Sequence, residues 1–172
     1  MDYLQLTQFD IFKGLKSSQI EQLKPLMTFC SFSKDMVIFE QGNKAEYIYI
    51  LAKGEVAISY KPYDGQPIVV ARIHPGNVFG WSSALSRDSY SSAALAVVES
   101  EAIRINGKSL QTLCDICPNT GAIFLDRLAG VISERIRHTH HEILALLSNG
   151  IDTDSECLRR ILSNGRKKGI HN

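Results

Sequence analysis

The sequence predicts an α+β fold: an antiparallel β-roll, or jelly roll, with N-terminal helices before it and a long C-terminal dimerisation helix after it. Between residue 36 and about residue 107, short β-rich runs alternate with turns at close, even spacing, which is typical of sandwiches and jelly rolls. Before residue 34 the apolar residues recur at helical spacing, and after residue 119 they form a long heptad-like pattern.

The N-terminal zone covers residues 1 to about 34 and is expected to be helical. Ser17 or Ser18 is expected to supply the N-cap of a helix, because both stand shortly before apolar residues at helical spacing. These apolar positions are Ile20, Leu23, Leu26 and Met27.

The central zone is expected to contain strands at residues 36–40, 47–51, 56–60, 68–73, 93–98 and 102–105. Turn residues separate them. Asp64-Gly65, between two β-rich runs, is a strong hairpin signal because both residues tolerate the left-handed conformation of a tight turn. Lys53-Gly54 and His74-Pro75-Gly76-Asn77 mark further turns.

The C-terminal zone contains a long helix, expected at about residues 119–148 and ended by Asn149-Gly150. Its apolar stripe runs through Leu125, Leu128, Ile132, Thr139, Ile143 and Leu146, with Ile136 beside it. The stripe favours a homodimer interface, since it is longer than a small β-roll could cover; packing on the helix's own domain is the alternative. One sensor domain is therefore expected at 1–148, followed at 149–172 by a short helix and a basic tail.

Composition supports one globular core, with 172 residues, 44% of them apolar and 22% charged. A net charge of +1 gives no general attraction to nucleic acid or to a membrane. The first residues lack the pattern of a signal peptide, and no apolar run reaches membrane-spanning length. We therefore expect a cytoplasmic protein whose cysteines are thiols.

Three segments carry a resemblance to a known family: Ile11–Leu15, Phe39–Val56 and Pro75–Gly80. In their glycines and apolar positions they resemble the cyclic-nucleotide-binding domain of CRP/FNR regulators, protein kinase A regulatory subunits and gated channels. The resemblance covers about residues 9 to 148. It implies a phosphate-binding cassette that begins at the Phe-Gly pair.

The chemistry of that cassette also follows from its residues. Gly80 follows a strand and opens a short polar turn, where backbone N–H groups and serine hydroxyls favour an anion. A turn that caps its own helix is the alternative. The candidate ligand-binding residues are Val78, Phe79, Gly80, Trp81, Ser82, Ser83, Arg87, Tyr90, Ser91 and Ser92, with Thr139 on the long helix.

Two positions depart from the family's pattern. Trp81 stands where nucleotide-binding members have the Glu that holds the ribose. Tyr90, with Ser91 as the next candidate, stands where they have the Arg that holds the cyclic phosphate. Arg87 replaces that Arg only if the loop is shorter. The Phe-Gly-Trp sequence resembles a variant branch of the domain. It indicates a different ligand or none, with Trp81 stacking on a base, lining an apolar pocket or filling the space that the nucleotide would use.

No catalytic set stands out, so an enzyme is not expected. Cys114 and Cys117 have C-x-x-C spacing without the further ligands that zinc needs, and are interpreted as structural thiols. His138, His140 and His141 are interpreted as a solvated face of the long helix, so no metal site is expected.

The sequence thus predicts a non-enzymatic sensor for signal transduction, which binds a cyclic nucleotide or another small phosphate-bearing effector and signals through a dimer helix. Residues 154–162 resemble only the first helix of the helix-turn-helix unit found in the family's transcription factors, so direct sequence-specific DNA binding is not expected. Two alternatives stay open: a CRP/FNR-like transcriptional regulator without its DNA-binding domain, and a ligand-free dimerisation module.

Overall fold

The computed structural model describes residues 6–137. Two compact units are formed, Met1–Ser133 and Glu134–Asn172. The strands are β1 Met27–Phe32, β2 Val37–Phe39, β3 Tyr47–Lys53, β4 Val56–Tyr60, β5 Ile68–Ile73, β6 Val78–Phe79, β7 Ala93–Ala96 and β8 Ser100–Asn106. The helices are η1 Asp10–Phe12, α2 Ser17–Leu23, η2 Lys24–Leu26, η3 Trp81–Ser83 and α3 Gly107–Ile116, and a C-terminal helix that covers residues 118–137.

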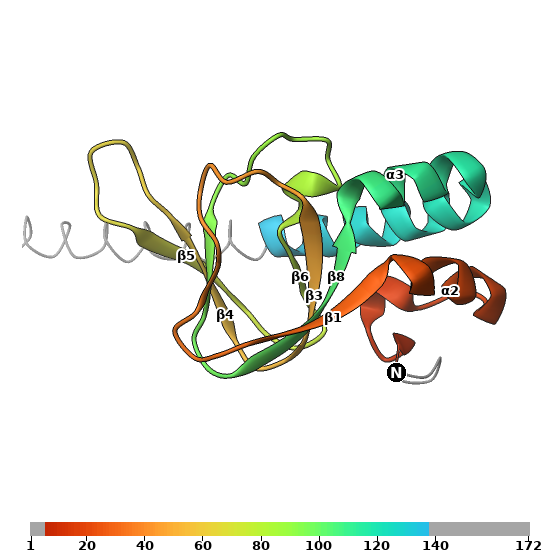
Figure 1. The fold of residues 1–172 in the computed structure, drawn as a ribbon, viewed down its shortest axis with the longest axis horizontal. Helices are drawn as coiled ribbons and strands as arrows, with labels where there is room; N and C mark the ends of the chain where they lie inside the picture. The colour runs from red at the N-terminus through yellow and green to blue at the C-terminus, as the bar shows by residue number, and fades with distance from the viewer. Residues whose placement is uncertain (1–5, 138–172) are drawn as a thin grey trace, which may run out of the picture. The chain divides into compact units, whose positions relative to one another are not determined.

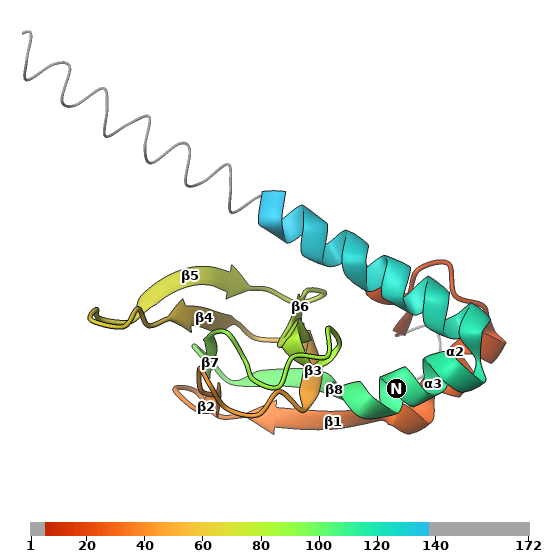
Figure 2. The ribbon, with the colours of Figure 1, turned by 90° about the horizontal axis from the view of Figure 1, so that it is seen from above.

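The strands form two four-stranded sheets, in the orders β1-β8-β3-β6 and β2-β7-β4-β5. Figure 1 shows the sheets from one side, and Figure 2 labels all eight strands. Every strand pair is antiparallel. Helices α2 and α3 lie together at one end of the strands, and the C-terminal helix runs back beside α3 (Figure 2). The predicted jelly roll with N-terminal helices and a C-terminal helix is therefore confirmed.

One predicted helical segment is a strand instead. Met27 was expected on the N-terminal helix, but the helical turns end at Leu26, one residue after Pro25, and β1 begins at Met27. All six residues of β1 pair with β8, from Met27 opposite Ile105 to Phe32 opposite Ser100. This long-range pairing outweighs the local helical spacing, which sequence periodicity alone cannot detect.

The sheet that contains β3 and β8 separates two cores, because successive residues of a strand point to opposite faces. Ile48, Ile50, Ile103 and Ile105 face the helices and pack with Phe12, Ile20, Leu110, Phe124 and Leu128. Tyr49, Leu51 and Ala102 face the interior of the roll. They pack there with residues of the second sheet: Phe39, Val56, Ile58, Ile73, Ala94 and Ala96.

The C-terminal helix packs on its own domain over its first half. Leu128, predicted to lie on the dimer stripe, is only 2% exposed and belongs to the helix-side core, which Ile132 also contacts. The interpretation of Leu128 as an interface residue was therefore wrong. Leu125 and Ile136 remain exposed. The rest of the predicted stripe, Thr139, Ile143 and Leu146, lies outside the described residues, as do His138, His140 and His141.

Candidate functional site

The cassette begins at Gly80, directly after β6. Gly80 has a φ of 70°, and a Cβ there would lie 3.0 Å from Cδ2 of Tyr49 and 3.1 Å from the carbonyl oxygen of Tyr47. The backbone at this point therefore needs glycine both for its left-handed conformation and for its close approach to β3.

The next residues form η3, which packs tightly on the start of α3. A Cβ at Gly107 would lie 2.5 Å from the carbonyl oxygen of Ser83, so the two backbones are in direct contact. Ser82 and Ser83 are buried, and the Ser83 hydroxyl donates to the carbonyl oxygen of Gly80 at 3.3 Å. This bond lies within the turn and uses the donor of the Ser83 hydroxyl.

Trp81 turns toward the helices. Its partly buried ring packs against the helix-side core rather than against the aromatic cluster of the interior. The sequence interpretations, in which Trp81 stacks on a base, lines an apolar pocket or fills the nucleotide's space, all placed this ring at the ligand position. The Trp81 ring lies elsewhere because η3 packs on α3, and this packing is specified only by the tertiary structure.

Tyr90 occupies the interior of the roll and is 4% exposed. Its hydroxyl accepts a hydrogen bond from the Tyr47 backbone N–H at 3.0 Å and donates one to the Tyr47 carbonyl oxygen at 2.7 Å. Its ring stacks on Phe39 with centroids 3.8 Å apart. Burial raises the pKa of the Tyr90 phenol, so the hydroxyl stays protonated and keeps its donor proton.

Further rings fill the interior around Tyr90. Tyr49 stacks on Phe79 at 4.9 Å and lies 5.8 Å from Phe39, while Phe32 meets Tyr49 edge-on at 6.3 Å. Burial also raises the pKa of the Tyr49 phenol. The cassette therefore presents an uncharged aromatic surface to the interior at the point where the family resemblance implies an arginine.

The end of the cassette loop is fixed to an earlier turn by backbone hydrogen bonds. Ala45 N donates to Asp88 O, Tyr90 N to Asn43 O and Gly42 N to Tyr90 O, each at 2.9 Å. The segment 88–90 thus pairs antiparallel with residues 42–45, and this pairing holds the Tyr90 backbone in place.

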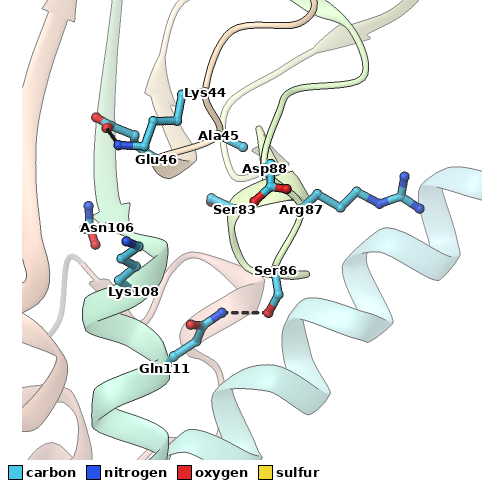
Figure 3. A pocket seen from close by; sticks show the side chains of 10 residues that line it. All are labelled: Lys44, Ala45, Glu46, Ser83, Ser86, Arg87, Asp88, Asn106, Lys108 and Gln111. Carbon is cyan, nitrogen blue, oxygen red and sulfur yellow. Dashed lines mark hydrogen bonds and ion pairs between the residues drawn. The ribbon is translucent and has the colours of Figure 1, made fainter.

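Arg87 lies on the outside of this loop, exposed, at the rim of a surface pocket of about 460 Å³. The residues lining the pocket are Lys44, Ala45, Glu46, Ser83, Ser86, Arg87, Asp88, Asn106, Lys108 and Gln111 (Figure 3). The Arg87 side chain points away from Lys44 and Lys108 in Figure 3.

Interactions within the pocket use part of its polar surface. Lys44 forms an ion pair with Glu46 at 2.7 Å, and Gln111 donates to the Ser86 hydroxyl at 2.8 Å. Asp88 adds a second carboxylate. The lining of this pocket therefore carries three cations, Lys44, Arg87 and Lys108, against the two carboxylates of Glu46 and Asp88.

The remaining candidates are spread over different environments. Val78 and Phe79 are buried core residues of β6, Ser91 is exposed and Ser92 is partly buried. Thr139 lies outside the described residues. The cassette thus brings Gly80, Tyr90 and Phe79 to the interior, but it does not bring the serines and Arg87 together around one ligand position.

One charged residue of the interior was missed from the sequence. Arg104 lies on β8 between Ile103 and Ile105, which face the helices, so its own side chain starts on the interior face. Its guanidinium carbon lies 4.6 Å from the centroid of the Tyr47 ring. A charged residue between two isoleucines of a predicted strand is the sequence signal that would have found it.

The cysteine pair has no metal-binding context among residues 6–137, where no group of three potential ligands occurs. Cys114 and Cys117 are free thiols, and a Cβ at Gly121 would lie 2.6 Å from the Cys114 sulfur. Burial raises the pKa of the Cys114 thiol, which disfavours the reactive thiolate. The same described residues contain no helix long and apolar enough to cross a membrane.

Comparison with known proteins identifies the class. The family model of the cyclic nucleotide-binding domain matches residues 29–117, more than half of the chain. The chain therefore belongs to the cyclic nucleotide-binding domain family, and several of its relatives are CRP-like regulators.

The individual relatives are distant in sequence. The CRP-like cAMP-activated global transcriptional regulator of Mycobacterium tuberculosis is 23% identical over 142 residues, which cover 83% of this chain and 62% of that protein. The cyclic AMP receptor protein of Thermus thermophilus is 24% identical over 133 residues, covering 77% and 60%. The matches thus span about three fifths of these relatives' length.

Among solved structures, a cyclic nucleotide-binding domain from Methylobacillus flagellatus has a TM-score of 0.73 at 18% sequence identity. The match covers 82% of this chain and 79% of that one. At this identity the likeness supports the fold and no particular ligand.

Proposed function

We propose that this chain is a non-enzymatic regulatory domain that senses a small anionic effector other than cAMP or cGMP and signals as a homodimer through its C-terminal helix. The observation that carries the proposal is Tyr90, whose ring and hydroxyl occupy the interior position where the family resemblance implies the phosphate-binding Arg.

The chemistry of the replacement supports a change of ligand. A cyclic phosphate bound at the cassette needs a charge-assisted partner, and a phenol held by two bonds to Tyr47 has no free donor to give it. With Trp81 at the Glu position, the ribose contact is also missing. This domain therefore shares the fold of its cAMP-activated relatives but binds a different molecule.

The same aromatic filling favours one second candidate, a domain that binds no ligand and serves only in dimerisation. The stacked rings of Phe39, Tyr49, Phe79 and Tyr90 occupy interior volume that a bulky ligand would need. The two functions differ in one measurable property, which is whether any small molecule stabilises the folded state.

The dimer part of the proposal rests on exposed apolar residues of the helix. Leu125 is partly uncovered and Ile136 is 61% exposed, although both are large aliphatic residues on a helix. A partner subunit would cover them, since aliphatic stripes left in water are unfavourable.

The test is a thermal-shift panel followed by calorimetry on the full chain. A ligand at a hundred times its dissociation constant stabilises a protein by about 2.7 kcal/mol, which is readily measured. The panel contains cAMP, cGMP, cyclic dinucleotides, and small organic phosphates and carboxylates. Stabilisation by one of the non-cyclic anions, with none by cAMP, is expected. Tight cAMP binding contradicts the proposal, and no stabilisation by any compound favours the ligand-free module.

The oligomeric state is measured in the same samples by light scattering. A dimer whose association strengthens when the effector binds supports signalling through the helix, because linkage requires the same coupling in both directions. A monomer at all concentrations tested contradicts it.

A further inference from the structure

The alternation of side chains along β8 places the cation Arg104 on the face of the strand that points into the roll. On β8, Ile103 and Ile105 belong to the helix-side core, whereas Ala102 belongs to the interior core, and Arg104 shares the face of Ala102. Its direct neighbours are Thr28 on β1 and Tyr49 on β3. The charge therefore lies on one of the two central strands of the sheet, beside the aromatic interior.

Arg104 has no acidic partner among residues 6–137, where the ion pairs all involve other residues. Its Nε atom is buried and has no hydrogen-bond partner in that part of the chain. The ring of Tyr47 covers the guanidinium at 4.6 Å, but a π-face accepts no conventional hydrogen bond from Nε–H. A buried donor without a partner is costly, and an oxyanion would satisfy it.

We propose that Arg104 is the anion-binding group of this domain and that it holds the carboxylate or phosphate of a small organic effector on the inner face of the roll. The edge of a guanidinium presents Nε–H and one terminal N–H in parallel, which matches two oxygens of either group. This site deepens the proposed sensor function and rests on it, because it supplies from β8 the cation that the cassette lacks.

The surroundings of Arg104 define the rest of the ligand. Tyr47 provides an aromatic face, and Thr28, exposed and directly opposite Arg104 on β1, provides a hydroxyl. Cys30, two residues along β1 on the same face, is partly buried and weakly polar. Arg104 as a whole is only partly buried although its Nε atom is buried, so a ligand has to approach from the exposed part of the residue. These groups fit a compact anion with a flat apolar body.

The other cations near the cassette are poorer candidates. Lys44 is paired with Glu46, and both Arg87 and Lys108 are exposed. Arg72 on β5 is paired with Glu55. Arg104 differs from all four in combining a buried, unpartnered donor with an interior position.

The experiment titrates the full chain with benzoate, phenyl phosphate and the uncharged analogue benzamide, followed by NMR of the arginine Nε–H groups. We expect the Arg104 Nε–H resonance to shift saturably with at least one of the two anions and not with benzamide. Saturation with benzoate alone identifies a carboxylate effector, and saturation with phenyl phosphate alone identifies a phosphate effector.

Variants then assign the site. Arg104→Gln should weaken anion binding by about ten- to a hundredfold, and Arg104→Lys, which keeps the charge but loses the fork, by about tenfold. Arg72→Gln and Arg87→Gln are the matched controls and should bind as the wild type does. Because the wild-type resonance reports on Arg104 directly, the test holds even if Arg104→Gln fails to fold.

Two results overturn the assignment. If neither anion moves the Arg104 resonance saturably, the site does not exist, while the broader effector panel still tests the sensor function. If an anion binds but Arg87→Gln abolishes binding and Arg104→Gln does not, the domain senses an anion through the outer face of the cassette instead.

Discussion

Removing the hydroxyl of Tyr90 tests whether this residue fixes the cassette. Tyr90→Phe keeps the ring that stacks on Phe39 at 3.8 Å but removes both hydrogen bonds to the backbone of Tyr47. Each such bond contributes about 0.5–1.5 kcal/mol net, so the free energy of unfolding should fall by about 1–3 kcal/mol. With a urea m-value of about 1–3 kcal/mol per molar, the unfolding midpoint should fall by roughly 1 M.

The assay is urea unfolding followed by circular dichroism, with Tyr63→Phe as the matched control. Tyr63 is fully exposed in the β4–β5 connection, so its variant should stay within about 0.5 kcal/mol of the wild type. If Tyr90→Phe is as stable as that control, the two bonds do not hold the cassette, and Tyr90 is merely a ring that fills space.

Four further results are expected. The wild type should bind cAMP and cGMP at least about a hundredfold more weakly than a domain with the usual Glu and Arg, because two charge-assisted bonds of about 1.5–3 kcal/mol each are missing; submicromolar affinity in calorimetry would contradict this. Ile136→Asp should shift light scattering from dimer to monomer and leave the strand signal intact, whereas Leu128→Asp, at a site 2% exposed, should unfold the domain. Gly54→Ala should cost more than about 2 kcal/mol, since its Cβ would lie 2.2 Å from Ser100 Oγ at a φ of 93°; a wild-type melting temperature would show that the β3–β4 turn adapts. The free energy of unfolding should fall as pH rises above about 10. Burial raises the pKa of the Tyr49 and Tyr90 phenols above the ordinary value, so the stability that these two groups contribute is complete below the unfolded pKa and is lost as the folded phenols ionise. An unfolding midpoint that does not change in alkali would refute this prediction.

Ile132 also belongs to the stripe predicted on the long helix, so Ile132→Asp is another substitution that could test the dimer. Because Ile132 packs against the helix-side core, that change would also remove packing within the domain. Ile136, exposed and beside the original stripe, separates association from folding more cleanly.

The sequence by itself determined the fold class, the family and the place of the cassette. Turn glycines such as Gly54 and Gly80 have positive φ values, a conformation that other residues rarely adopt, so their spacing marks the turns of the roll directly. Strand alternation in runs such as Tyr47–Lys53 is equally local. These signals depend only on single residues and their sequence neighbours, so they can be detected without knowledge of the tertiary packing.

Only the tertiary structure decided which side chains face the interior of the roll. Trp81 turns to the helices, Arg87 to solvent and Tyr90 inward, although all three belong to one irregular loop with no period from which to predict direction. The same holds for Arg104, because its face depends on the register of β8 against β1 and β3, a pairing between residues far apart in the chain. The cassette's position follows from local backbone conformation, whereas the chemistry of its interior follows from long-range packing.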